Sequence, residues 1–172
     1  MMDAIDGRIG EAWAGDVPDG SHINLVIARR GSPTAAAAVG ALASPRPGHA
    51  PFLACLGAGN VVRPATIVVN KSTLESESLS RITWGAAQLG IAQGVLDAVA
   101  DGLLDAEAAA DIVLLVALWV DPAASDETAV RRANREAMHG AIANALAPDV
   151  AGAARALADR REDASNAFYG GE

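Results

Sequence analysis

The chain has 172 residues, of which 51% are hydrophobic and 20% are charged, so it can bury one sizeable core and is not a disordered chain. Its 13 basic and 21 acidic residues give a formal net charge of −8, which argues against nucleic acid as a partner. No apolar run reaches the roughly 18 residues that span a bilayer, so no membrane segment is expected.

The first part of the chain predicts two strands and a helix. Apolar and polar residues alternate over 8–14 and 22–28, and the aspartate, proline and glycine residues between them favour a turn. Ser32 and Pro33 form a helix start, because a serine side chain caps free backbone amides and proline suits the first helical turn. The helix is expected over 33–43.

Two apolar runs in the middle of the chain predict buried strands at 52–56 and 65–70, after a stretch at 44–51 that proline and glycine keep irregular. The segment LGAGNVV at 56–62 resembles the start of a dinucleotide-binding turn. Val62 stands where the third glycine of that motif belongs, so a plain loop between strands is the preferred interpretation.

The second half of the chain predicts mostly helix. The expected elements are a short helix at 72–81, a long helix at 84–100, a helical turn at 105–110, a central strand at 111–120 and an amphipathic helix at 126–147. Gly90 and Gly94 share one helix face, so another backbone can approach closely there. The buried side of the last helix is expected to include Ala133, Ala137, Ile142 and Leu146.

This order of elements predicts a single domain of the α/β (α+β) class, in which helices cover one mixed sheet in a two-layer sandwich. The domain is expected to span residues 1–148. A charged, alanine-rich segment follows, which predicts a helical extension and a flexible tail over 149–172.

Cysteine and histidine are sparse in this chain. The single Cys55 cannot form an internal disulfide, and the N-terminal residues are acidic where a signal peptide has basic and then apolar residues, so a cytoplasmic protein is expected. His22, His49 and His139 are far apart in the sequence, which argues against a metal site. The Gly-x-Ser-x-Gly string of serine hydrolases is absent.

Two titratable residues lie at expected strand ends. His22 opens the second strand, where an imidazole with its ordinary pKa near 6.5 suits a proton donor. On the residues alone, a surface histidine is the more common interpretation. Lys71, the only lysine, is either a solvated strand end or a point charge that contacts an anionic or carbonyl group of a ligand.

Other polar residues permit two interpretations each. Gln88 either caps a local backbone group or binds the amide edge of a heterocycle. Arg131, Arg132 and Arg135 share part of one helix turn, where a solvated helix face is a commoner arrangement than a phosphate site.

Several strings, taken together, resemble the formaldehyde-activating enzyme family. They occur in the family's order and spacing from residue 8 to about 147. The strings are Gly10-Glu11-Ala12, Gly15-Asp16, Ser21-His22-Ile23-Asn24-Leu25, Arg30-Gly31-Ser32-Pro33, Asn70-Lys71-x-Thr73, Ala87-Gln88-x-Gly90, Gln93 with Asp97-Ala98-Val99-Ala100, and Gly102.

The resemblance implies an enzyme that condenses formaldehyde with tetrahydromethanopterin, a reduced pterin that serves as co-substrate, and that holds no tightly bound cofactor. It also implies a two-layer α/β sandwich that assembles as a homopentamer with active sites between subunits. His22 is then the proton donor. The positions that then contact substrate are Asn24, Leu53, Lys71, Thr73 and Gln88.

The chain departs from the family pattern near the chemistry. Asn24 stands where the family has an aspartate, Leu89 replaces a histidine, and residues 118–122 lack a His-Trp pair. An aspartate beside His22 would favour a protonated imidazole and a cationic iminium, so Asn24 is expected to weaken both effects. Two functions remain open: an active enzyme, which is preferred, and a non-condensing paralogue that binds another pterin or a small carbonyl compound.

Overall fold

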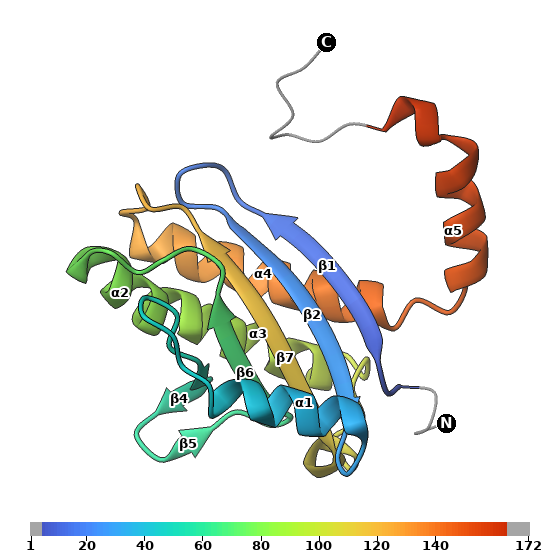
Figure 1. Ribbon diagram of the computed structural model, residues 1–172, viewed down its shortest axis with the longest axis horizontal. Helices are drawn as coiled ribbons and strands as arrows, with labels where there is room; N and C mark the ends of the chain where they lie inside the picture. Colours follow the sequence, from blue (N-terminus) through green and yellow to red (C-terminus); the bar gives the residue numbers. More distant parts are fainter. Residues whose placement is uncertain (1–4, 165–172) are drawn as a thin grey trace.

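The computed structural model describes residues 5–164, and its main feature is one five-stranded sheet (Figure 1). The strands lie in the order β1 (Arg8–Ala14), β2 (Ser21–Arg29), β7 (Ile112–Val120), β6 (Ala65–Asn70) and β3 (Phe52–Leu53). β6 and β7 are parallel, whereas the other neighbours are antiparallel. The sheet is therefore mixed, as the sequence predicts.

Helices α3 (Gln88–Ala100) and α4 (Glu127–Ala145) cover one face of the sheet, and α1 (Pro33–Leu42) lies across one end of the other face (Figure 1). Alternate residues of the strands point toward α3 and α4, because successive side chains of a strand face opposite sides. Ile23, Leu25 and Ile27 of β2 are fully buried in this way. The predicted two-layer sandwich is confirmed, with α1 as a small addition on the second face.

Three helical predictions change in detail. The helices expected at 72–81 and 84–100 form one continuous segment, in which α2 (Glu77–Ile82) leads through a π-helical turn at Thr83–Ala87 into α3. No proline separates the two helices, and the π turn absorbs an extra residue without ending the helix. The turn expected at 105–110 ends in a 3-10 turn at Ala109–Asp111.

The strand predicted at 52–56 is wrong in its second half. After β3 the chain leaves the main sheet as β4 (Cys55–Gly57), which pairs with β5 (Asn60–Val61) in a two-stranded hairpin. Gly59 has a φ of +79°, a left-handed conformation that glycine adopts without strain. The segment 56–62 is therefore a hairpin, and β6 follows it instead of the helix that a dinucleotide-binding turn requires.

Gly90 and Gly94 bring α3 and α4 into backbone contact, as predicted. A Cβ atom on Gly90 would lie 2.3 Å from the carbonyl oxygen of Arg131, and one on Gly94 would lie 2.5 Å from that of Arg135. Both distances are far shorter than a van der Waals contact, so only glycine fits at these two positions.

Replacing Gly90 with alanine is expected to lower the free energy of unfolding by about 1–3 kcal/mol, because the new methyl group forces the two helix backbones apart. Gly40 of α1 is the matched control, since a Cβ there meets no atom within 4 Å. Its alanine variant is expected to be neutral or more stable by about 0.5–1 kcal/mol. Denaturant unfolding at one protein concentration measures both, and equal stabilities for the two variants would contradict the close approach.

Two of the three clustered arginines join α4 to α3. Arg131 Nη1 donates to Gln93 Oε1 at 2.9 Å, and Arg135 donates to both carboxylate oxygens of Asp97. The bonds from Arg135 hold the pKa of Asp97 below its ordinary value. Arg132 and Arg135 are exposed, so the predicted solvated helix face is confirmed, and the contacts of Arg131 and Arg135 with α3 add to it.

The lowered pKa of Asp97 predicts a loss of stability in acid. A carboxylate of this kind stabilises the fold fully above the pKa near 3.9 of an unfolded chain, and its contribution disappears as the pH falls through the lower folded value. The midpoint temperature of thermal unfolding is therefore expected to decrease when the pH drops below about 4. The decrease is expected to be smaller in Asp97→Asn. If the midpoint temperature decreased equally in both proteins between pH 5 and pH 3, the ion pair between Asp97 and Arg135 would not contribute to the loss of stability in acid.

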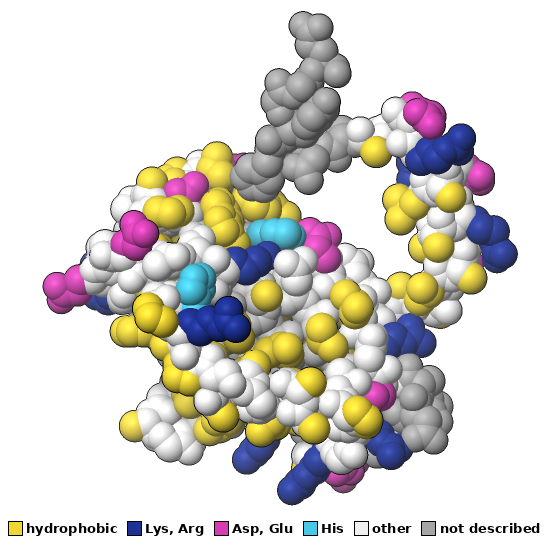
Figure 2. All heavy atoms as spheres, in the orientation of Figure 1, with side chains coloured by type: hydrophobic (Ala, Val, Ile, Leu, Met, Phe, Trp, Pro, Cys, Tyr) yellow, Lys and Arg dark blue, Asp and Glu magenta, His cyan; other side chains and the backbone are white. Residues whose placement is uncertain are grey.

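Helix α5 (Val150–Asp159) stands away from the sandwich (Figure 1). None of its residues is buried, and hydrophobic side chains lie along its inner side with charged ones on the outside (Figure 2). The domain boundary at residue 148 stays a prediction, and the last part of the tail, 165–172, lies outside the described residues. Between residues 5 and 164, no helix is both long and apolar enough to cross a membrane.

Candidate active site

The sheet face opposite α3 and α4 carries a polar cluster where α1 does not cover it. His22 and Asn24 point to this face, because they alternate along β2 with buried Ile23. Glu11 of β1 lies opposite Asn24 in the strand register, and Lys71 directly follows β6. Histidine and basic side chains gather on this face of the molecule (Figure 2).

His22 is hydrogen-bonded through both ring nitrogens. Its Nε2 lies 2.8 Å from Oε1 of Glu11, and its Nδ1 lies 3.0 Å from Nζ of Lys71. The same Nζ donates to Oδ1 of Asn24 at 2.8 Å. Because a carboxylate only accepts, Nε2 carries a hydrogen, whereas the bond between Nδ1 and Nζ forms with the proton on either partner. Three residues singled out from the sequence therefore meet in one network.

Lys71 is the half-buried member of this network. Burial lowers the pKa of its ammonium group, and the nearby carboxylate of Glu11 opposes this effect less strongly. Nζ of Lys71 lies 3.0 Å from Nδ1 of His22, so the two side chains are close enough to exchange a proton.

Thr73 lies in the loop after Lys71, and that loop is fixed by neighbouring side chains. Thr73 Oγ1 is 3.3 Å from Nε2 of His49, whose Nδ1 donates to the carbonyl oxygen of Asn70 at 2.8 Å. Asn70 Nδ2 in turn donates to the carbonyl oxygen of Gly48 at 2.7 Å. Sequence reasoning weighed His49 only as a metal ligand and missed this contact. In the part of the chain that the structure describes, no group of three or more His, Cys, Asp or Glu side chains is placed to hold a metal ion.

Leu53 and Gln88 lie apart from the His22 cluster. Leu53 pairs with Ile67 in the β3–β6 ladder, and Gln88 Oε1 accepts from the backbone amide of Cys55 at 3.3 Å. Gln88 also lines a cavity of about 240 Å³. Over residues 5–164, no hydrogen bond joins Gln88 to His22. One chain therefore holds the predicted site residues in separate groups.

Glu11 is the main residue that sequence reasoning missed. It belongs to the string Gly10-Glu11-Ala12, which by itself indicates no role for the carboxylate. The signal that identifies it is strand pairing: the turn at 15–20 places Glu11 opposite Asn24, two residue pairs along the ladder from His22 and on the same face of the sheet. A carboxylate on an adjacent strand is therefore in reach of the imidazole.

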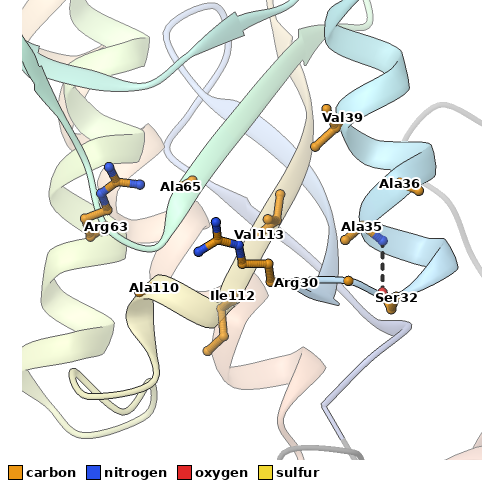
Figure 3. Close-up of a pocket in the computed structure, with 11 residues that line it drawn as sticks. Arg30, Ser32, Ala35, Ala36, Val39, Arg63, Ala65, Ala110, Ile112 and Val113 are labelled. Carbon is orange, nitrogen blue, oxygen red and sulfur yellow. Dashed lines mark hydrogen bonds between the residues drawn. The ribbon is translucent and has the colours of Figure 1, made fainter.

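A larger cavity, of about 710 Å³, lies away from this cluster. It is bounded by α1 and by the first residues of β6 and β7, and Arg30 and Arg63 extend over it (Figure 3). Its lining otherwise comes mostly from small or apolar side chains such as Ala35 and Val113. Because its lining includes no histidine, lysine or carboxylate side chain, the candidate active site is the His22 cluster.

Comparison with known proteins identifies a matching family and named relatives. The family model for formaldehyde-activating enzyme (Fae) matches residues 9–168. The chain is 41% identical over 146 residues to 5,6,7,8-tetrahydromethanopterin hydro-lyase of Methanosarcina barkeri, which covers 85% of this chain and 82% of that protein.

Two longer proteins also match. The proteins named bifunctional enzyme Fae/Hps of Methanothrix thermoacetophila and Archaeoglobus fulgidus are 33% and 32% identical to this chain. Each alignment covers 83% of this chain but only 37% of the longer protein. Since the family model and the Methanosarcina relative both match over most of its length, this chain belongs to the formaldehyde-activating enzyme family.

Proposed function

We propose that this chain condenses formaldehyde with tetrahydromethanopterin to give methylene-tetrahydromethanopterin and water, with His22 as the proton donor. The observation that carries the proposal is the contact of 3.0 Å between His22 Nδ1 and Lys71 Nζ, because it gives the imidazole a source of protons. Membership of the family and the relative named as a hydro-lyase support the same reaction.

The reaction needs one proton delivered and one recovered. A pterin nitrogen adds to the carbon of formaldehyde, and the proton of that nitrogen passes to the oxygen to give a carbinolamine. His22 then donates a proton to the hydroxyl group, which leaves as water, and an iminium cation remains. The second nitrogen attacks the iminium carbon, and the proton it releases restores His22. All atoms of both substrates are thereby accounted for.

The remaining polar residues of the cluster hold His22 in place for this exchange. Glu11 fixes the Nε2 edge, and Lys71, itself bonded to Asn24, fixes the Nδ1 edge. An imidazole held on both sides keeps one orientation, so positioning adds to the acid–base effect. We propose substrate contacts for Asn24, Lys71, Leu53, Thr73 and Gln88.

The alternative function is a non-condensing paralogue that binds another pterin or a small carbonyl compound. Asn24 is its main support, because it removes a charge from the site. The intact network around His22 and the identity of 41% to a named hydro-lyase favour the condensing enzyme.

We also propose a homopentamer with the active sites between subunits, as the resemblance implies. The separation of Gln88 and Leu53 from His22 within one chain supports a site that two subunits complete. Light scattering on the purified protein tests the assembly. Tetrahydromethanopterin enters as co-substrate, and no further cofactor is proposed. A cytoplasmic location stays a prediction.

The experiment that tests the function compares the rate of condensation with and without the protein. We expect the protein to accelerate the spontaneous reaction of formaldehyde with tetrahydromethanopterin. A folded protein that binds tetrahydromethanopterin but leaves the spontaneous rate unchanged would support the non-condensing paralogue.

Replacing Glu11 with glutamine is expected to lower turnover by about ten- to a hundredfold with little change in KM, because the amide can turn its oxygen to Nε2 but no longer supplies a charge. Glu127→Gln is the matched control, since Glu127 is an exposed partner of Arg81. Steady-state kinetics on both variants measure the effect. An equal loss in the two variants would show that Glu11 acts only through the net charge of the chain.

A further inference from the structure

His22 lies between two tryptophans on the neighbouring strands. The strand register places Trp13 of β1 and Trp119 of β7 directly opposite His22 on its two sides. The ring centroids of Trp13 and His22 are 5.7 Å apart, and those of Trp13 and Trp119 are 5.2 Å apart. The three rings therefore form one continuous aromatic surface, and we call Trp13 and Trp119 the indole pair.

The indole pair faces away from the hydrophobic core. Both side chains project from the sheet face opposite α3 and α4, and Trp13 is 40% exposed. Its Nε1 donates to the carbonyl oxygen of Gly15 at 3.0 Å, which anchors the polar edge of the ring and holds its face in position. An anchored, part-exposed indole is suited to contact a ligand, because little conformational entropy is lost on binding.

The charges around His22 favour a cation on the side of Trp13. Lys71 occupies the Nδ1 edge of the imidazole, whereas Glu11 occupies the Nε2 edge. Glu11 and Trp13 are two residues apart on β1, so their side chains point to the same face of the sheet. A positive group is attracted both by this carboxylate and by the electron-rich face of an indole.

We propose that the indole pair is the binding surface for the flat heteroaromatic ring of the reduced pterin, and that it also stabilises the cationic iminium formed beside His22. This inference rests on the proposed function and names the part of the protein that holds the ring system. A group that takes a proton from His22 must reach a ring nitrogen, where it takes the place of Glu11 at Nε2 or of Lys71 at Nδ1. It then lies beside Trp13, whose ring centroid is 5.7 Å from that of His22.

The test measures pterin binding without formaldehyde, so that no turnover occurs. Tryptophan fluorescence is recorded in a Trp84→Phe background, because Trp84 is the third tryptophan of the chain and lies outside the indole pair. Tetrahydromethanopterin is titrated into this protein and into the same protein with Trp13→Leu or Trp13→Phe. The leucine variant keeps apolar bulk but loses the ring, whereas the phenylalanine variant keeps a smaller ring.

We expect tetrahydromethanopterin to quench the indole pair, and we expect Trp13→Leu to weaken binding about tenfold. Trp13→Phe is expected to retain binding within about threefold. In turnover, Trp13→Leu is expected to raise the KM for the pterin and to lower kcat, because the iminium loses an aromatic neighbour. Light scattering on each variant checks that the assembly is unchanged.

The results separate this inference from the function on which it rests. If pterin binding depended on Trp13 in a protein without condensing activity, the binding role of the indole pair would stand and the proposed enzymatic function would be overturned. If Trp13→Leu kept full activity and unchanged pterin affinity, the proposed enzymatic function would stand and the binding role of the indole pair would be overturned. The binding role would also be overturned if the fluorescence of the indole pair changed with protein concentration but not with the pterin. That result would indicate that a second copy of the chain covers these rings.

Discussion

Replacing His22 with alanine is expected to lower turnover by about two to four orders of magnitude while the protein remains folded, because the carbinolamine hydroxyl then loses its acid. The side chain of His22 is 28% exposed and lies outside the main core, so its removal leaves the packing of β2 intact. The measurement is the condensation rate at saturating tetrahydromethanopterin, corrected for the spontaneous reaction.

The matched control for this prediction is His139→Ala. His139 is on α4, where it pairs with Asp101 at 3.0 Å, and over residues 5–164 no hydrogen bond joins it to the His22 cluster. Its variant is expected to keep the full rate. A His22→Ala protein that condenses formaldehyde as fast as the unmodified chain would exclude His22 as the acid.

Replacing Asn24 with aspartate is expected to raise turnover, by about three- to tenfold, because a carboxylate takes the place of a neutral amide 2.8 Å from Lys71 Nζ. The new charge favours the ammonium form of Lys71 and opposes the lowering of its pKa by burial. The pH at which activity falls on the alkaline side is therefore expected to move upward. Rates measured across pH with the two proteins test both parts.

Asn60→Asp controls for the extra negative charge, since Asn60 lies in the exposed β4–β5 hairpin. This variant is expected to leave the rate and its pH dependence unchanged. A lower rate in Asn24→Asp would mean that the site is built around the amide, and would favour the paralogue with another ligand.

Local sequence signals were enough to predict most of the fold. The alternation over 8–14 and 22–28, the Ser32-Pro33 helix start and the apolar run at 111–120 all appear in the structure within about a residue. These signals involve neighbours in the chain, so no long-range information is needed. The prediction of one strand over 52–56 was wrong in its second half, because residues 55–57 leave the main sheet to pair with residues further along the chain.

The candidate site was predicted as separate residues and not as a network. His22, Asn24 and Lys71 were named from the sequence, but 47 residues separate Asn24 from Lys71, and only the pairing of β2, β7 and β6 brings them together. Glu11 was missed for the same reason, since its role depends on the register of β1 against β2. No short-range pattern encodes a contact between strands.

Lys71 also has a practical consequence for a protein that is proposed to handle formaldehyde. It carries the only side-chain amine in the chain, since the other 12 fixed cations of the total of 13 are arginines. Isotope-labelled formaldehyde with a mild reductant would methylate that amine and place a single side-chain label beside His22. The chain thus provides its own spectroscopic reporter, through which resonance measurements can follow the centre of the site without any engineered residue.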